Sequence, residues 1–157
     1  WTIPGNRALA VHNDIEYISL NLKINDEKKN IIIASDLVES FIKENKIEEY
    51  KVNFSIKGHE LTNTFCKHTL YDSGYNFEVP ILHGDFVTTE QGTGIVHICP
   101  VHGMDDFILG KQHDLELPMT INESGIYYDH IPVFNGQHIF KVDQNVCDEI
   151  KLSLIHI

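Results

Sequence analysis

The side chains in this sequence best suited to chemistry are a histidine and an aspartate nine residues apart. His97 and Asp106 lie in the run GTGIVHICPVHGMDDF, where Asp106 is the second of two adjacent carboxylates. Ile95 to Cys99 predicts a short strand that Pro100 stops, and the carboxylates predict the first turn of a helix. Because side chains alternate along a strand, Ile95, His97 and Cys99 share a face. His97 and Asp106 can therefore line one pocket, which suits a small polar molecule carrying positive charge.

Alternating and helical patterns along the rest of the chain predict a mainly β fold. Strands are expected where apolar and β-branched residues alternate, and helices where apolar residues recur every three or four positions. The expected strands are 8–22 (broken near 12–14), 31–33, 50–56, 62–70, 79–82, 86–88, 95–99, 126–133 and 138–142. The expected helices are 36–46, 107–113 and 142–152. Many short strands with few helices predict an α+β, mainly β fold, with a closed or nearly closed β-barrel core decorated with a few short helices.

Length and composition predict a single domain, residues 1–157, with a substantial core. The chain is 42% hydrophobic, and no apolar run approaches the roughly 20 residues that a membrane helix needs. Three widely separated cysteines, Cys66, Cys99 and Cys147, fit a reducing compartment, so a cytoplasmic location is expected. The chain begins with Trp1 rather than Met, which suggests a fragment of a longer protein.

The charge balance bears on which partners the chain can bind. The formal net charge is -11, with 12 Lys and Arg against 23 Asp and Glu. Proteins that bind duplex nucleic acid usually neutralise its phosphates with a basic face. Independent binding of a duplex is therefore disfavoured, whereas action on the tip of a nucleic acid whose body is bound elsewhere stays open.

Histidines and aspartates near the motif can be drawn as a metal cluster, comprising Asp105, Asp106, His102 and His113. A hydrolytic metal site needs three protein ligands and an open position, and this spacing matches no metalloenzyme motif. No metal ligand is therefore expected. Asp105 is instead expected in the first turn of a helix, where the helix dipole stabilises a negative charge.

Two segments together resemble the isoleucyl-tRNA synthetases. Residues 1–8, WTIPGNRA, are similar to the end of that family's threonine-rich peptide, and residues 92–107 are similar to its second editing motif. Segments between them agree in order, namely SDLVES at 35–40, KGHEL at 57–61 and GDFVT at 84–88. By this resemblance the chain is identified as a member of the inserted editing domain of these enzymes, also called connective polypeptide 1.

The resemblance implies a function, post-transfer editing. The domain is expected to hydrolyse valine mis-esterified to the isoleucine tRNA, as a second sieve after aminoacylation. Its expected partners are the 3′ end of that tRNA and the rest of the synthetase, with no membrane, as a monomer. No cofactor is expected for the domain, although the full enzyme uses ATP. The chain lacks the HIGH and KMSKS motifs of the aminoacylation domain, so no aminoacylation activity is expected.

The resemblance also implies roles for particular residues. Asp106 is expected to bind the α-ammonium group of the misacylated valine through a charge-assisted bond. His97 and Thr2 are expected to face each other and narrow the pocket so that isoleucine does not fit. Asn6 is expected near the ester and the attacking water. The expected catalytic residues are Asp106, His97 and Asn6, and the expected substrate-binding residues are Trp1, Thr2, His97, Cys99 and Asp106.

Other readings of the sequence stay open. A non-catalytic RNA-docking or interaction module would keep only the fold, and a metal-dependent hydrolase is a third alternative. His97 is either a general base or mainly a wall of the pocket, since aminoacyl esters are reactive and need little beyond a positioned water and a stabilised oxyanion. The family's peptide has threonines before the tryptophan, whereas this sequence begins at Trp1, so the activity of the isolated fragment is also open.

Overall fold

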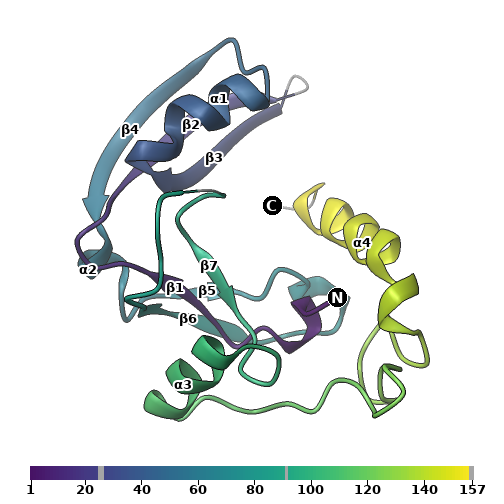
Figure 1. Cartoon of the computed structure of the whole chain (residues 1–157). Coiled ribbons are helices and arrows are strands. Elements are labelled where there is room, and N and C mark those ends of the chain that lie inside the picture. Colours follow the sequence, from purple (N-terminus) through teal and green to yellow (C-terminus); the bar gives the residue numbers. More distant parts are fainter. Residues whose placement is uncertain (25–26, 91, 156–157) are drawn as a thin grey trace. The chain divides into compact units, whose positions relative to one another are not determined.

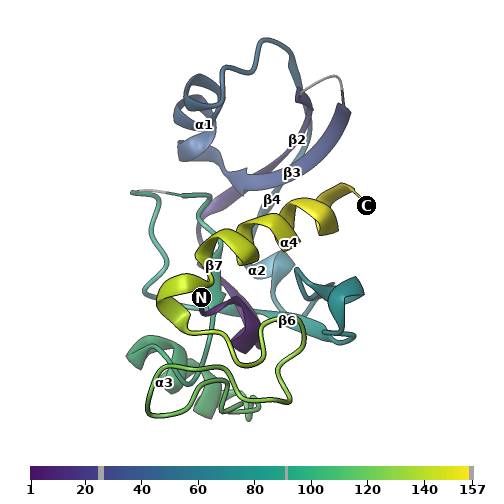
Figure 2. The same ribbon diagram turned by 90° about the vertical axis from the view of Figure 1, so that its right-hand side faces the viewer.

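The computed structural model describes residues 1–24, 27–90 and 92–155, shown as ribbons in Figures 1 and 2. These residues form two compact units, each with its own hydrophobic core. Unit 1 comprises Trp1–Ala8, Phe65–Pro80 and His97–Ile157, and unit 2 comprises Leu9–Thr64 and Ile81–Val96. No described helix combines the length and apolar character that crossing a membrane requires. The single domain expected over residues 1–157 stays a prediction.

Unit 2 is built on a three-stranded antiparallel sheet in the order β3-β2-β4. Its strands are β2 (Glu16–Ile24), β3 (Glu27–Ala34) and β4 (Tyr50–Lys57), and β4 confirms the strand expected over 50–56. A 3-10 turn leads from β3 into α1 (Val38–Glu44), whose apolar side chains pack against the sheet's buried residues, and α2 (Gly58–Leu61) follows β4. The core of this unit consists of Val11, Tyr17, Leu20, Leu22, Ile33, Ala34, Leu37, Ile47 and Leu61.

Unit 1 carries fewer strands and more turns. Its helices are α3 (Met104–Gln112) and α4 (Asp143–Ile155), which confirm the helices expected over 107–113 and 142–152. Three 3-10 turns accompany them, η1 (Ile3–Gly5), η3 (Tyr71–Ser73) and η4 (Ile139–Lys141). The buried cluster of this unit consists of Leu70, Tyr75, Tyr127, Ile131, Phe134, Val142 and Val146. Ile3 of η1 packs against this cluster, so the start of the chain is held by the same core as α4.

The second sheet has the order β5-β6-β1-β7. It contains β1 (Ala8–Val11), β5 (Phe65–Lys67), β6 (Glu78–His83) and β7 (Val96–Ile98), with β5 antiparallel and β1 parallel to β6. In the described residues neither sheet closes on itself, because one ends at β3 and β4 and the other at β5 and β7. The mainly β architecture with few helices is confirmed, and the closed or nearly closed barrel is wrong.

The strands that would have extended the barrel do not form. Phe86 lies in a turn, residues 87 and 88 have no regular secondary structure, and 138–142 contain the 3-10 turn η4. Residues 126–133 contribute only isolated bridges, from Tyr127 to Ile121 and from Ile126 to His138. Pro132 lacks a backbone N–H for a ladder, and Gly125 and Gly136 adopt positive φ on either side. The alternating apolar residues of 126–133 are therefore buried in the core of unit 1, but they lie in turns and not in a strand.

A buried glycine sets the chain path at the entry to β7. Gly94 has φ of +72°, and its carbonyl accepts a 2.7 Å hydrogen bond from the hydroxyl of Tyr17. A Cβ added at Gly94 would lie 2.5 Å from the Cβ of Ala34. Both the positive φ and the close approach therefore require glycine at this position.

Gly94→Ala should lower the free energy of unfolding by about 2–4 kcal/mol, since backbone strain adds to overpacking. Gly92→Ala is the matched control, because Gly92 also has positive φ (+75°) but a Cβ there meets nothing within 4 Å. The control should cost only about 1 kcal/mol, from strain alone. Urea unfolding of the two variants measures the difference, and equal destabilisation would show that contact with Ala34 is unimportant.

Candidate functional site

His97 is the centre of a hydrogen-bonded group in unit 1. It is the middle residue of β7, and its ring lies between two side chains from the start of the chain. Its Nε2 lies 3.0 Å from Thr2 Oγ1, and its Nδ1 lies 2.6 Å from Asn6 Nδ2. His97 is thus in direct contact with two expected site residues that lie more than 90 positions before it in the sequence.

The turn between Thr2 and Asn6 sets the spacing of these two side chains. It is the 3-10 helix η1, closed by hydrogen bonds from Gly5 N–H to Thr2 O (2.9 Å) and from Asn6 N–H to Ile3 O (3.0 Å). Pro4 suits the first turn of a helix because its φ is already fixed near helical values and it needs no N–H partner there. Only the three residues of this turn separate Thr2 from Asn6, so both side chains reach one imidazole.

Cys99 lies against the inner side of this turn. It is 1% exposed, and a Cβ added at Gly5 would collide with its Sγ. Burial raises the pKa of the thiol to about 11, so Cys99 is protonated at neutral pH. A buried, protonated thiol is a packing group and a poor nucleophile. The structure therefore places Cys99 beside η1.

Asp106 lies in the first turn of α3 and folds back toward the end of β7. Its Oδ2 accepts a 2.7 Å hydrogen bond from the backbone N–H of Cys99. A Cβ added at Gly103 would lie 2.9 Å from Asp106 Cγ, so glycine leaves room for the carboxylate. Asp105 is in the same first turn, as expected, and is exposed. Asp106, but not Asp105, is therefore held beside the histidine corner.

The ring of His97 is neutral at physiological pH. Burial lowers its pKa, and the charge of Asp106 acts in the opposite direction with a smaller effect. A neutral imidazole has one donor and one acceptor nitrogen. When Asn6 Nδ2 donates to Nδ1, Nε2 carries the proton and donates to Thr2 Oγ1. Thr2 and Asn6 thus fix both the tautomer and the orientation of the ring.

Asn6 also carries a polar atom that the other described residues do not satisfy. The side chain is 4% exposed, and its Oδ1 is buried without a hydrogen-bond partner in the described part of the chain. An unsatisfied buried carbonyl oxygen costs about 1–3 kcal/mol, so its presence needs an explanation beyond stability. A donor from a ligand or from water would satisfy it.

Trp1, expected to bind the substrate, is held by contacts to its ring and its carbonyl. The indole lies edge-on to the ring of His102, with centroids 4.6 Å apart, and is 37% exposed. The carbonyl of Trp1 accepts a 2.5 Å hydrogen bond from the hydroxyl of Tyr127. His102 Nε2 in turn lies 3.0 Å from Thr120 Oγ1.

Sequence reasoning missed two residues that support this group, Tyr127 and His68. His68 is 2% exposed, and its Nε2 lies 3.0 Å from the carbonyl of Ile3 in η1. Both side chains bind backbone carbonyls, which carry no side-chain signature, so periodicity and motif spacing could not identify them. A histidine in the aromatic-rich stretch from 68 to 77 is the only hint that the sequence offers.

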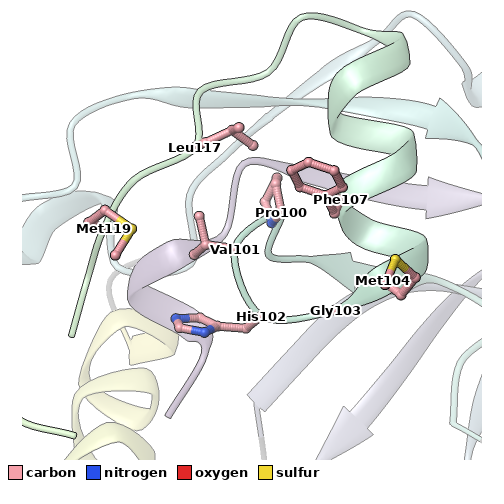
Figure 3. Close-up of a pocket in the computed structure, with 8 residues that line it drawn as sticks. All are labelled: Pro100, Val101, His102, Gly103, Met104, Phe107, Leu117 and Met119. Atoms are coloured by element: carbon pink, nitrogen blue, oxygen red, sulfur yellow. The ribbon is translucent and has the colours of Figure 1, made fainter. Parts of the chain in front are cut away.

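A hollow of about 730 Å³ lies beside the start of α3 (Figure 3). Its lining comes from the loop after β7, from α3 and from the chain that follows α3, and consists of Pro100, Val101, His102, Gly103, Met104, Phe107, Leu117 and Met119. None of the six expected site residues lines it. Among the described residues, no group of three or more His, Cys, Asp or Glu side chains is arranged to hold a metal ion.

Comparison with known proteins identifies the family. Residues 13–140 match the family model described as leucyl-tRNA synthetase, editing domain. The chain belongs to this family of synthetase editing domains. Thr2 and Asn6 precede the matched region, whereas His97, Cys99 and Asp106 lie within it. The editing-domain fold is also supported by a solved structure described as "The crystal structure of GlLeuRS-CP1", with a TM-score of 0.72 at 15% identity over 96% of this chain and 76% of that chain.

The sequence relatives of this editing domain are isoleucine–tRNA ligases. The chain is 40% identical over 154 residues to the enzyme of Gluconobacter oxydans, covering 94% of this chain and 16% of that protein. It is also 40% identical to the enzymes of Pelagibacter ubique, over 96% of this chain and 17% of that protein, and Colwellia psychrerythraea, over 99% and 16%. The editing domain thus spans about one sixth of the length of these relatives.

Stability should fall in mild acid because of His68. Burial lowers its folded-state pKa from 6.5 to about 4, so between these values the unfolded chain binds more protons than the folded one. The free energy of unfolding should therefore drop by up to about 3 kcal/mol from pH 6.5 to pH 4 through this group. Urea unfolding at several pH values tests this, and His68→Gln, which cannot titrate, should show a shallower decline. Equal slopes for both proteins would contradict the assignment.

Proposed function

We propose that this editing domain hydrolyses valine mis-esterified to the isoleucine tRNA, as part of an isoleucine–tRNA ligase. The observation that carries the proposal is the contact of Thr2, Asn6 and His97 in one hydrogen-bonded group, with Asp106 close enough to act on the histidine electrostatically. These residues come from the two segments that resemble the editing motifs of isoleucyl-tRNA synthetases. The isoleucine–tRNA ligase relatives support the same assignment.

Asp106 binds the α-ammonium group of the misacylated valine. A carboxylate offers about four acceptor positions, so the bond that Oδ2 accepts from Cys99 N–H leaves capacity for an ammonium group. The hydrogen bond from Cys99 N–H also fixes the position of the Asp106 carboxylate. An ammonium ion that leaves water to enter a pocket requires an anion in place, because the cost of desolvating it is otherwise uncompensated.

His97 acts mainly as a wall and a positioning group. Both of its ring nitrogens are engaged, so it could take a proton from water only by breaking a bond to Thr2 or Asn6. Thr2 and His97 instead close one side of the space available to the amino-acid side chain. Isoleucine exceeds valine by one methylene group, for which the free energy at stake is about 1–3 kcal/mol.

Hydrolysis itself needs little more than an oriented water. The water oxygen bonds to the ester carbonyl carbon, the bond from that carbon to the ribose oxygen breaks, and a proton of the water passes to the ribose oxygen. The products are free valine and a tRNA whose terminal ribose hydroxyl is restored. Orientation can account for a large part of such a rate enhancement. Asn6, with its unsatisfied Oδ1 beside His97, is suited to hold the water or the ester. We propose this reaction without a cofactor or a metal ion.

The tRNA is held chiefly by other parts of the larger protein. With 12 basic and 23 acidic residues, this domain repels a phosphate backbone more than it attracts one. Its own contact with tRNA is therefore confined to the aminoacylated 3′ end. The rest of the synthetase chain is the second partner, in keeping with a domain that spans about one sixth of its relatives.

The proposal is tested by deacylation of valyl-tRNA and isoleucyl-tRNA, both charged on the isoleucine tRNA, by the full-length enzyme. The wild-type enzyme should hydrolyse the valyl ester and spare the isoleucyl ester. Asp106→Asn should reduce valyl-tRNA hydrolysis at least a hundredfold, since it removes the charge while an amide oxygen can still accept from Cys99 N–H. Asp105→Ala is the control and should stay near wild type. A wild-type enzyme that leaves both esters intact would instead favour a module that keeps only the fold.

A second prediction concerns the side-chain sieve. Thr2→Ala should allow hydrolysis of isoleucyl-tRNA, because it widens the pocket by roughly the volume that isoleucine adds. Thr2→Val keeps the volume and loses the hydroxyl, so it should still spare isoleucyl-tRNA if the wall acts by size. The rate for each ester measures the effect in both variants. If Thr2→Ala spares isoleucyl-tRNA as well as wild type does, Thr2 is not part of the wall.

A further inference from the structure

Two buried rings donate hydrogen bonds to the backbone carbonyls on either side of Thr2. The hydroxyl of Tyr127 donates to Trp1 O at 2.5 Å, and His68 Nε2–H donates to Ile3 O at 3.0 Å. The peptide unit before Thr2 and the peptide unit after Ile3 are therefore both anchored. The Thr2 side chain between them is the one that meets His97 Nε2.

The anchoring rings are themselves fixed by their surroundings. His68 Nδ1 accepts the N–H of Leu70 at 3.0 Å, which makes Nε2 the protonated nitrogen of the neutral ring. The imidazole stacks on Tyr75, with centroids 4.7 Å apart and planes 14° from parallel. Tyr127 is 1% exposed and lies 5.9 Å from the ring of Phe134, within the buried cluster of unit 1. Neither donor can move without disturbing that core.

Both donors keep their protons over a wide pH range. Burial lowers the pKa of His68 to about 4, so the ring is neutral, and burial raises the pKa of Tyr127 to about 12, so the phenol is intact. At neutral pH both donors therefore carry the proton that their hydrogen bonds require.

We propose that Tyr127 and His68 are positioning residues that fix Thr2 against His97 and so set the selectivity of the editing site for the amino-acid side chain. The proposal rests on the proposed function, because selectivity between valine and isoleucine is the property that it explains. Discrimination by one methylene group requires the wall to be placed to a fraction of an ångström, and a short 3-10 turn is too small to hold such a position alone. Two fixed donors, on the carbonyls of the residues before and after Thr2, supply that rigidity.

The chain offers a close control for each donor. The hydroxyl of Tyr75 donates to Pro132 O at 3.0 Å in the same cluster, so Tyr75→Phe removes an equivalent buried bond outside the turn. At position 68, glutamine places an amide N–H near the location of Nε2, whereas asparagine can replace only the Nδ1 contact with Leu70 N–H. His68→Gln thus keeps the bond to Ile3, and His68→Asn loses it.

The experiment compares these four variants in the full-length enzyme, measuring kcat and KM for valyl-tRNA and isoleucyl-tRNA deacylation together with thermal melting. Tyr127→Phe and His68→Asn should each lower, roughly tenfold, the kcat/KM for valyl-tRNA divided by the kcat/KM for isoleucyl-tRNA. The change should lie mainly in kcat rather than in KM. Tyr75→Phe and His68→Gln should keep the wild-type ratio. Tyr127→Phe and Tyr75→Phe should melt at similar temperatures, which separates positioning from stability.

The outcomes distinguish this proposal from the one on which it rests. A wild-type enzyme that hydrolyses valyl-tRNA, with the same ratio in Tyr127→Phe as in Tyr75→Phe, overturns the positioning role and leaves the editing function intact. Equal ratios for His68→Asn and His68→Gln overturn the part assigned to His68. A wild-type enzyme that does not hydrolyse valyl-tRNA overturns both proposals.

Discussion

The contact of one imidazole with both ends of a short turn is the interaction on which the site depends. His97 can be held by Thr2 and Asn6 together only because the 3-10 turn between them brings these side chains to the same ring. This 3-10 turn requires Gly5, since a Cβ at that position would collide with the Sγ of Cys99. Cys99 is held in place because its backbone N–H donates to Asp106. Ring, turn, thiol and carboxylate therefore form one packed group, in which a displacement of any member moves the others.

Charge in this group is concentrated on a single residue. His97 and His68 are kept neutral by burial, and Cys99 and Tyr127 are kept protonated for the same reason. Asp106 is therefore the ionised side chain that acts on His97. In a site of low polarity, one fixed charge orients a ligand more strongly than several mobile ones, because fewer solvent dipoles screen it.

The sequence predicted this fold where local patterns matched tertiary structure. The alternation in residues 50–56 matched a strand that pairs with β2, although Tyr50, Val52 and Phe54 are exposed. The helical period near the C-terminus was reliable because Val142, Val146 and Ile150 pack in the core of unit 1. The same alternation failed over 126–133, where Pro132 and the glycines at 125 and 136 favour turns that fill the core without a ladder. The closed barrel was predicted from expected strands, such as 126–133, that the structure does not form. The site itself came from resemblance, because no periodicity brings Thr2 to His97, and Tyr127 and His68 bind carbonyls that every residue possesses.

The negative charge of Asp106 is not explained by the bond that it makes. Its Oδ2 accepts the N–H of Cys99, and an asparagine oxygen could accept the same bond. Its position in the first turn of α3 stabilises a charge by only about 0.3–1 kcal/mol. Two costs oppose this gain. The Asp106 carboxylate is repelled by the other charges of a chain with net charge -11, and partly burying it beside the neutral ring of His97 removes part of its hydration. Structure alone would therefore be served as well by an uncharged acceptor. A carboxylate at this point is best accounted for by a cation that binds there, and the ammonium group of an aminoacyl ester is a cation of the right size and charge.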